Sequence, residues 1–202
     1  MTQEEMLAAA QADIDDLNAG RITFAEMQKR GYLRQQEFFA PKLMEYRQHG
    51  QWQQFIDLTL SVYELMPLAF SFYDEVPDNM KYQFAIGAYI HHGDHVPAVR
   101  KAVRTAARYG KAELPAELAE ADTITVYRAG EETIEKAKYR ISWTTDYEIA
   151  DFFLNKYIGR HANRLYMGEI RPTDIIAYCD ERNEKEVMQY GKVFNISDIT
   201  PE

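Results

Sequence analysis

Cysteine and long apolar runs are scarce in this sequence. Its 202 residues include one cysteine, Cys179, so no disulfide can form within the chain. No apolar run approaches the roughly 20 residues that cross a bilayer. The start of the chain, Met1 to Glu5, has neither the basic nor the apolar part of a secretory signal. These absences predict a cytoplasmic protein with no membrane partner.

Basic residues are outnumbered by acidic ones. The chain has 23 lysines and arginines against 32 aspartates and glutamates, which gives a formal net charge of -9 at pH 7. Such a charge repels phosphate backbones and disfavours nucleic acid as a partner, although a local basic groove could still bind it. The hydrophobic content of 46% is typical of globular proteins, and the length suffices for one or two folded units.

A convincing metal-binding cluster is also lacking. The segment His91-His92-Gly93-Asp94-His95 contains imidazoles and a carboxylate, which are common metal ligands. Adjacent histidines point apart, however, so a polar turn between helices explains the segment more simply. Cys179 has no evident histidine partner for nucleophilic catalysis and is expected to be a small buried side chain. We therefore expect a protein that works without a metal.

Helical patterns dominate the first part of the chain. Apolar residues recur at helical spacing from Met1 to Met66, and Gly31 and Pro41 are predicted to lie at helix ends. A turn-rich segment follows. We therefore expect a helical N-terminal region at residues 1–78 and a second domain at residues 79–202, which starts with further helices.

Strand patterns dominate from residue 123 onwards. β-Branched and aromatic residues form strand-like runs at residues 123–127, 165–170, 174–179 and 186–196. One helix interrupts them after Thr145, which together with Glu148 has the pattern of a capping box. Helices followed by strands predict an α+β fold.

Two glutamates and one arginine in this second half could carry chemistry. Glu184 and Glu186 lie two residues apart at the start of a predicted strand, so both carboxylates should face one site. A solvated charged loop is the alternative. Arg128 ends an apolar strand beside Ala129 and could hold a phosphate with its guanidinium group. The alternative for Arg128 is a surface salt bridge.

Two hydroxyl groups complete the set of candidates. Ser142 and Thr144 share one face of a short predicted strand, and Trp143 takes the other face. The hydroxyls could orient a carboxylate and a ribose. The alternative is that Thr144 and Thr145 only cap the helix that follows.

The order of these groups resembles that in the ADP-ribosyltransferases whose motifs are Arg, Ser-Thr-Ser and Glu-x-Glu. Val126-Tyr127-Arg128 is similar to the first motif and Glu184-Lys185-Glu186 to the third. Ser142-Trp143-Thr144, followed by Ala150-Asp151-Phe152-Phe153, is similar to the second. The resemblance is strongest over residues 121–198. It implies a mixed or antiparallel β-sandwich as the catalytic core.

The resemblance implies that NAD is bound as the donor of ADP-ribose, without a metal. Arg128 would anchor the phosphates of NAD, and Ala129, Ser142 and Thr144 would lie beside it in the NAD site. Many members of the family have a glycine directly after the arginine. Here Ala129 stands before Gly130, so the sequence departs from that pattern.

The resemblance also implies separate roles for the two glutamates. Glu186, held by Ser142, would stabilise the oxocarbenium-like transition state in which nicotinamide leaves. Glu184 would prepare the acceptor, which a glutamate at this position suggests is an arginine of a target protein. Trp143 and Thr144 depart from the second and third residues of the Ser-Thr-Ser motif.

Three alternative functions fit the same sequence. The enzyme could be an NAD glycohydrolase, or it could transfer ADP-ribose to a base of a nucleic acid. Alternatively, the second half could be a degenerate, non-enzymatic scaffold beside an acidic helical module that binds proteins. The intact Arg128, Ser142 and Glu186 argue against degeneracy.

Overall fold

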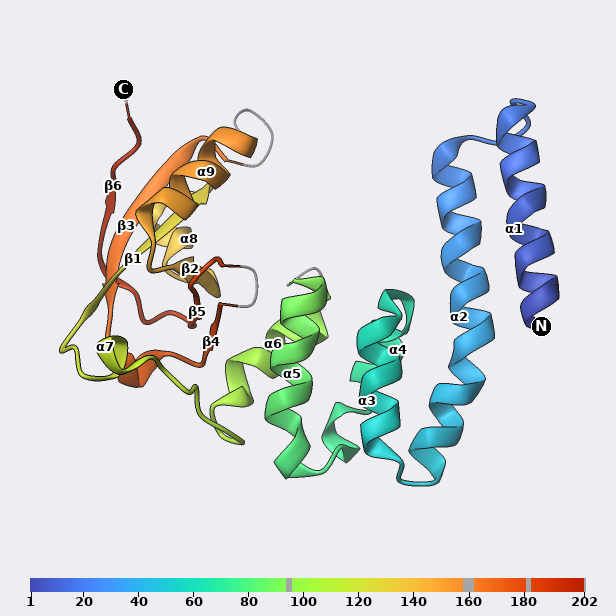
Figure 1. Ribbon diagram of the computed structural model, residues 1–202, viewed down its shortest axis with the longest axis horizontal. Helices are drawn as coiled ribbons and strands as arrows, with labels where there is room; N and C mark the ends of the chain where they lie inside the picture. Colours follow the sequence, from blue (N-terminus) through green and yellow to red (C-terminus); the bar gives the residue numbers. More distant parts are fainter. Residues whose placement is uncertain (94–95, 158–161, 181–182, 202) are drawn as a thin grey trace. The chain divides into compact units, whose positions relative to one another are not determined.

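The computed structural model describes residues 1–93, 96–157, 162–180 and 183–201. The chain forms two compact units, Met1–Thr105 and Ala106–Glu202, here called the helical unit and the sheet unit. The sheet unit contains a six-stranded antiparallel sheet, so the chain is α+β, as predicted (Figure 1). Along the chain, the boundary between the two units lies after Thr105 rather than near Asp78. The helical unit includes α5 (Asp78–His92), because this helix packs against α3 (Trp52–Ser61).

Two long helices begin the helical unit. α1 (Gln3–Asn18) and α2 (Phe24–Gln48) each start with a capping box, and they pack against each other. α2 runs through Gly31 and Pro41, so the predicted helix ends at these residues were wrong. Leu43, two residues after Pro41, is fully buried, and α2 packs against α3. Tertiary contacts therefore outweigh the local preference of proline to end a helix.

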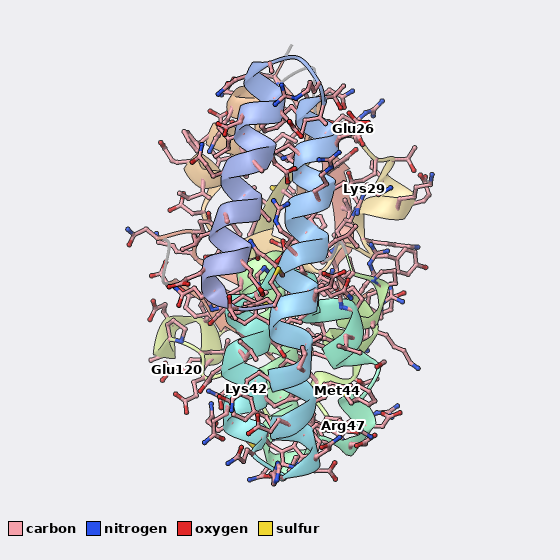
Figure 2. All side chains as sticks on the ribbon, turned by 90° about the vertical axis from the view of Figure 1, so that its right-hand side faces the viewer. Glu26, Lys29, Lys42, Met44, Arg47 and Glu120 are labelled. Carbon is pink, nitrogen blue, oxygen red and sulfur yellow. The ribbon has the colours of Figure 1, made fainter. Side chains whose placement is uncertain are left out.

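Polar groups join α1 to α2. Asp13 is the one residue of α1 that is buried, and its carboxylate accepts hydrogen bonds from Arg30 and Arg34 of α2. The bond from Arg30 Nη1 measures 2.9 Å. Hydrogen bonds from Arg34 and then Arg30 hold the pKa of Asp13 below its ordinary value. Figure 2 shows the side chains along α2, from Glu26 near one end to Arg47 near the other.

An apolar core fills the rest of the helical unit. α3 packs against α4 (Met66–Phe70) and α5. The ring of Phe84 lies 4.5 Å from that of Phe70 and 6.2 Å from that of Phe55, measured between centroids, and Phe55 and Phe84 are fully buried. The remaining elements are η1 (Tyr63–Leu65), η2 (Tyr73–Glu75) and α6 (Pro97–Ala106).

The sheet of the second unit has the strand order β4-β5-β2-β1-β3-β6, and every neighbouring pair is antiparallel. The strands are β1 (Ile124–Gly130), β2 (Ser142–Thr144), β3 (Arg164–Ile170), β4 (Ala177–Cys179), β5 (Glu186–Met188) and β6 (Phe194–Asp198). Because β1 pairs with both β2 and β3, the strands of the described residues form one sheet, whereas the expectation was the two packed sheets of a sandwich.

Two predicted strands differ from the observed ones. The run at residues 186–196 forms β5 and β6, with Gly191 at a φ of 67° between them, a conformation that glycine adopts without a steric penalty. The run at residues 174–179 becomes strand only from Ala177, after the 3-10 turn η3 (Pro172–Asp174). The prediction at residues 165–170 is confirmed by β3.

One helix, α9 (Tyr147–Tyr157), packs on β1, β2 and β3. Its first turn is capped by Asp146, whose Oδ1 accepts the backbone N–H of Glu148 at 2.9 Å, so the predicted capping by Thr145 was wrong. Ala150 and Leu154 of α9 are buried against the sheet. Two one-turn helices, α7 (Ala116–Ala119) and α8 (Ile134–Ala137), complete the unit. Across the described parts of the chain, no helix has the length and apolar character needed to span a membrane.

Candidate functional site

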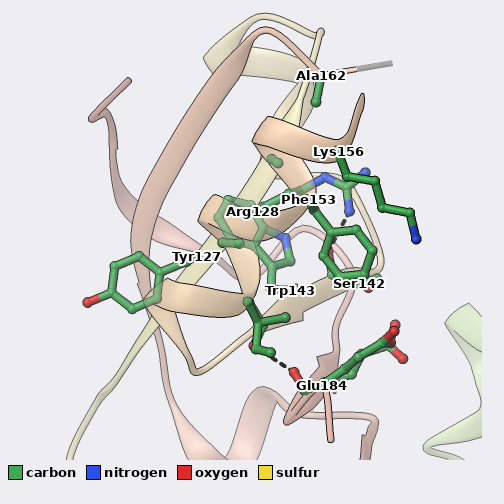
Figure 3. Close-up of a pocket in the computed structure, with 13 residues that line it drawn as sticks. Tyr127, Arg128, Ser142, Trp143, Phe153, Lys156, Ala162 and Glu184 are labelled. Carbon is green, nitrogen blue, oxygen red and sulfur yellow. Dashed lines mark hydrogen bonds between the residues drawn. The ribbon is translucent and has the colours of Figure 1, made fainter. Parts of the chain in front are cut away.

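A pocket of about 460 Å³ lies within the sheet unit. It is lined by all of the predicted NAD-binding and catalytic residues, namely Arg128, Ala129, Ser142, Thr144, Glu184 and Glu186. The other lining residues are Tyr127, Trp143, Ile149, Ala150, Phe153, Lys156 and Ala162 (Figure 3). Residues that are far apart in the sequence therefore come together from β1, β2, α9 and the segment that enters β5.

The pairing of β2 with β5 places three of these residues on one face. Thr144 lies opposite Glu186 in the antiparallel pair, and Ser142 lies two residues before Thr144 in β2. Directly opposed residues of antiparallel strands point to the same face, so Ser142, Thr144 and Glu186 share the face that borders the pocket. Trp143 and Val187 point to the other face, where both are buried in the core of the sheet unit. The predicted alternation around Trp143 is confirmed.

Glu184 reaches the same pocket by a different route from the one predicted. β5 begins only at Glu186, and Lys185 has a φ of 44°, in the left-handed region. Strand alternation therefore does not relate the two glutamates. The backbone N–H of Lys185 donates to Asp180 Oδ1 at 3.1 Å, and its ammonium group pairs with Asp146 at 2.9 Å. These two contacts hold the tight turn that brings both glutamates to the pocket.

The hydroxyl groups of Ser142 and Thr144 are used differently. Thr144 Oγ1 donates to the carbonyl of Glu184 at 2.7 Å and accepts the N–H of Asp146 at 3.1 Å. Thr144 therefore fixes the Glu184 turn next to β2, and its hydroxyl proton is not available to a substrate. Ser142 instead contacts Arg128 through its backbone carbonyl, and its side chain lies on the face of β2 that borders the pocket.

Arg128 is held by two acceptors that lie on different elements. Its Nη1 donates to the carbonyl oxygen of Ser142 at 2.7 Å, and its Nε donates to Glu132 Oε1 at 3.2 Å. The side chain of Glu132 is only 5% exposed, so this pair is not the solvent-exposed salt bridge that was the alternative for Arg128. The guanidinium group is fixed at the pocket wall.

Glu132 was not predicted from the sequence. Besides Arg128, it accepts a hydrogen bond from Arg140 Nε at 2.8 Å and one from the backbone N–H of Glu131 at 3.0 Å. Burial raises the pKa of Glu132, but the charge of Arg128, a backbone hydrogen bond and the charge of Arg140 together outweigh it, so the pKa lies below its ordinary value and the carboxyl is ionised at neutral pH. The only signal in the sequence was a glutamate four residues after Arg128, which is a common spacing.

Lys156 is a second pocket residue that was not predicted. It follows Phe153 by three residues on α9, and Phe153 follows Ile149 by four, so one face of the helix supplies this wall. In Figure 3, Arg128 and Lys156 extend toward one end of the pocket and Glu184 lies toward the other. Two cationic side chains thus lie toward one end of the pocket and the side chain of Glu184 toward the other.

The histidine-rich segment, which was the alternative metal site, is described only in part. Asp94 and His95 of the histidine-rich segment lie outside the described residues. A ring nitrogen of His92 lies 2.9 Å from the carbonyl oxygen of Leu60, with which it can form a hydrogen bond. No group of three or more metal-ligating side chains is found among the described residues.

The pocket is the feature that bears most directly on function. Its volume falls within the range of about 300 to 1,000 Å³ that is typical of sites for small molecules and cofactors. Cationic, acidic and aromatic side chains all line it. Comparisons of the chain with protein-family models, with curated proteins and with solved structures found no match.

Proposed function

We propose that the protein is an NAD-dependent mono-ADP-ribosyltransferase that modifies arginine side chains of target proteins. The observation that carries the proposal is the meeting in one pocket of Arg128, Ser142, Glu184 and Glu186. Their residue types and their order in the sequence also match the pattern expected for this chemistry. Their gathering from three separate segments supports a common chemical task.

Arg128 suits the phosphates of NAD. Its Nε donates a hydrogen bond to the Glu132 carboxylate and its Nη1 donates one to the Ser142 carbonyl. Within the described residues, its Nη2 makes no hydrogen bond. A guanidinium group stays charged at any relevant pH and binds phosphate oxygens strongly. Lys156 adds a second positive charge to the same end of the pocket. The ring of Phe153 offers apolar surface for the flat parts of the dinucleotide.

Glu186 suits the step in which NAD is cleaved. The bond between the ribose C1′ and the nicotinamide nitrogen breaks, its electron pair leaves with nicotinamide, and positive charge develops on the ribose. The residue Glu186 is 5% exposed, so its carboxylate acts in a partly desolvated site where electrostatic stabilisation is stronger than in water. The Ser142 hydroxyl lies on the same face of the sheet and can hydrogen-bond a ribose hydroxyl or Glu186 when NAD is bound.

Glu184 suits the step in which the acceptor reacts. It is half-buried, so a side chain of another protein can approach it from solvent. A guanidinium nitrogen of the acceptor forms the new bond to C1′ and loses one proton, which Glu184 accepts. Because the pKa of a guanidinium group exceeds about 12, this proton needs a nearby base. The products are nicotinamide, an ADP-ribosylated arginine and a proton.

The test uses purified protein, NAD labelled in its adenylate part, and a cell lysate. Nicotinamide release is measured, and the labelled macromolecules are treated with either protease or nuclease. We expect nicotinamide release together with label that protease removes and nuclease leaves. Label removed by nuclease would identify a nucleic-acid acceptor, and nicotinamide release without label would identify a glycohydrolase. Neither release nor label would overturn the proposal.

A further inference from the structure

We propose that Glu132 is a positioning residue, which holds the guanidinium group of Arg128 in the orientation that binds a phosphate-bearing ligand. The ligand used to test it is NAD, so the inference rests on the proposed function. Glu132 does not line the pocket. It acts through Arg128, which does.

The contacts of Arg128 define the plane and direction of its guanidinium group. Nε donates to Glu132 Oε1 at 3.2 Å and Nη1 donates to the carbonyl oxygen of Ser142 at 2.7 Å. Two bonds from different nitrogens of a rigid, planar group leave it one orientation. Without the bond to Glu132, only the Ser142 carbonyl would remain, and the group could rotate about that single contact.

Glu132 is itself held in place from several directions. Its Oε1 also accepts from Arg140 Nε at 2.8 Å, and its Oε2 accepts from the N–H of Glu131 at 3.0 Å. Its backbone carbonyl accepts the hydroxyl of Tyr166, a side chain that is fully buried in the core of the sheet unit. A carboxylate with this many partners is a fixed point from which Arg128 can be oriented.

Gly130 leaves the space that Glu132 occupies. A Cβ atom at this position would lie 2.5 Å from Oε2 and 2.9 Å from Cδ of Glu132, which is far closer than atoms can approach. An alanine here would therefore push the carboxylate away from its partners without changing any charge. Gly130 and Glu132 give two independent ways to disturb the same contact to Arg128.

Arg140 provides the matched control. It donates to the same oxygen of Glu132 as Arg128 does, but it does not line the pocket. If Glu132 served only the stability of the sheet unit, loss of Arg140 and loss of the Glu132 charge would have similar consequences. If Glu132 positions Arg128, only the second change alters ligand binding.

The experiment measures NAD affinity by calorimetry, and folding by thermal melts, for the full chain and its variants. We expect Glu132→Gln and Gly130→Ala each to raise the Kd for NAD about tenfold, a typical coupling between neighbouring residues of one network. Arg140→Gln should stay within about twofold of the wild type, because the Glu131 N–H and Arg128 itself still hold the Glu132 carboxylate when Arg140 is lost. The double variant Glu132→Gln with Arg128→Ala should bind NAD no more weakly than Arg128→Ala alone, because Glu132 acts through Arg128.

A second readout needs no NAD. In nuclear magnetic resonance spectra, the Nε–H of Arg128 should exchange slowly with water in the wild type and in Arg140→Gln, and quickly in Glu132→Gln and Gly130→Ala. Slow exchange in all four proteins would overturn the inference. So would an unchanged Kd in folded Glu132→Gln and Gly130→Ala.

The inference and the proposed function can fail separately. A wild type that neither binds nor cleaves NAD contradicts the proposed function, while the exchange of the Arg128 Nε–H still tests the contact to Glu132. If Glu132→Gln does not fold, Gly130→Ala decides the result, since it displaces the same carboxylate and keeps its charge.

Discussion

Each unit of the chain contains a buried carboxylate that is held by two arginines, and the two clusters differ in what surrounds them. In the helical unit, Arg30 and Arg34 bind Asp13 and join α1 to α2. In the sheet unit, Arg128 and Arg140 bind Glu132. The second cluster places Arg128 at the wall of the pocket of about 460 Å³, which neither Arg30 nor Arg34 lines.

The comparison shows that a buried ion pair alone does not indicate a functional site. The Asp13 cluster supplies polar contacts in a hairpin where α1 has no other buried residue. The Glu132 cluster supplies an oriented cation, because Arg128 also binds the Ser142 carbonyl and faces a cavity shared with Glu186. The two clusters differ in that the Ser142 carbonyl and the pocket adjoin only Arg128 of these four arginines. The charged residues themselves predict neither feature.

The largest expected effect concerns the apolar core of the helical unit. Phe84→Ala should lower the free energy of unfolding by about 3 to 5 kcal/mol, the usual cost of deleting a buried phenylalanine. Phe84 is fully buried and contacts the rings of Phe55 and Phe70. Denaturant unfolding, followed by amide exchange in α3 to α5, measures the change. Equal stability of variant and wild type would show that this core contributes less than its burial suggests.

A smaller effect separates the two arginine clusters. Arg128→Ala should weaken NAD binding by about 1.5 to 3 kcal/mol, the cost of losing hydrogen bonds to a charged group. Arg34→Ala removes an arginine from the other cluster and should leave NAD affinity unchanged, because Arg34 does not line the pocket. Calorimetric titration of both variants makes the test. If the two lose affinity equally, the comparison between the clusters is wrong.

Acid should affect the hairpin of α1 and α2 through Asp13. The arginines hold the pKa of folded Asp13 below its ordinary value of 3.8, so the ionised carboxylate stabilises the hairpin above that pH. This contribution is lost as the pH falls through the folded pKa. The protection of the α1 amides, measured relative to their intrinsic exchange rates at each pH, should therefore fall in acid in the wild type and depend less on pH in Asp13→Asn. The same pH dependence in both proteins would contradict the assignment.

The smallest expected effect is that of a chelator. Nicotinamide release should be the same with and without EDTA, because the proposed chemistry uses the positive charge of the nicotinamide ring and protein carboxylates rather than a metal. Nicotinamide release is measured before and after treatment, with magnesium and zinc added back separately. Loss of activity that one of these ions restores would contradict the proposed site.

The sequence was sufficient to predict the α+β class and six of the residues that line the pocket, although not Lys156. Residue type largely determines chemistry, so an arginine at a strand end and paired glutamates could be recognised without coordinates. Alternation along β2 also correctly separated Trp143 from Ser142 and Thr144. These features depend on neighbours within a few residues of the chain.

Features that depend on distant contacts could not be predicted. The left-handed backbone of Lys185 is held by Asp180 and by Asp146, which lies 39 positions away in the sequence. The position of Glu132 depends on Tyr166, which donates to its backbone carbonyl, and on the space left by Gly130. The continuation of α2 through Pro41 likewise depends on its packing against α3. In each case, tertiary contacts outweigh the local preference of the chain.

The most direct test of the central claim compares Glu184→Gln, Glu186→Gln and the wild type in one assay that records both nicotinamide release and protein labelling. The wild type should show both, and Glu186→Gln should show neither, because both reactions require cleavage of NAD. Glu184→Gln should still hydrolyse NAD slowly, with water as the acceptor, and so release nicotinamide. It should fail to label protein. A wild type that releases no nicotinamide, or a Glu186→Gln variant that equals it in both readouts, would contradict the account.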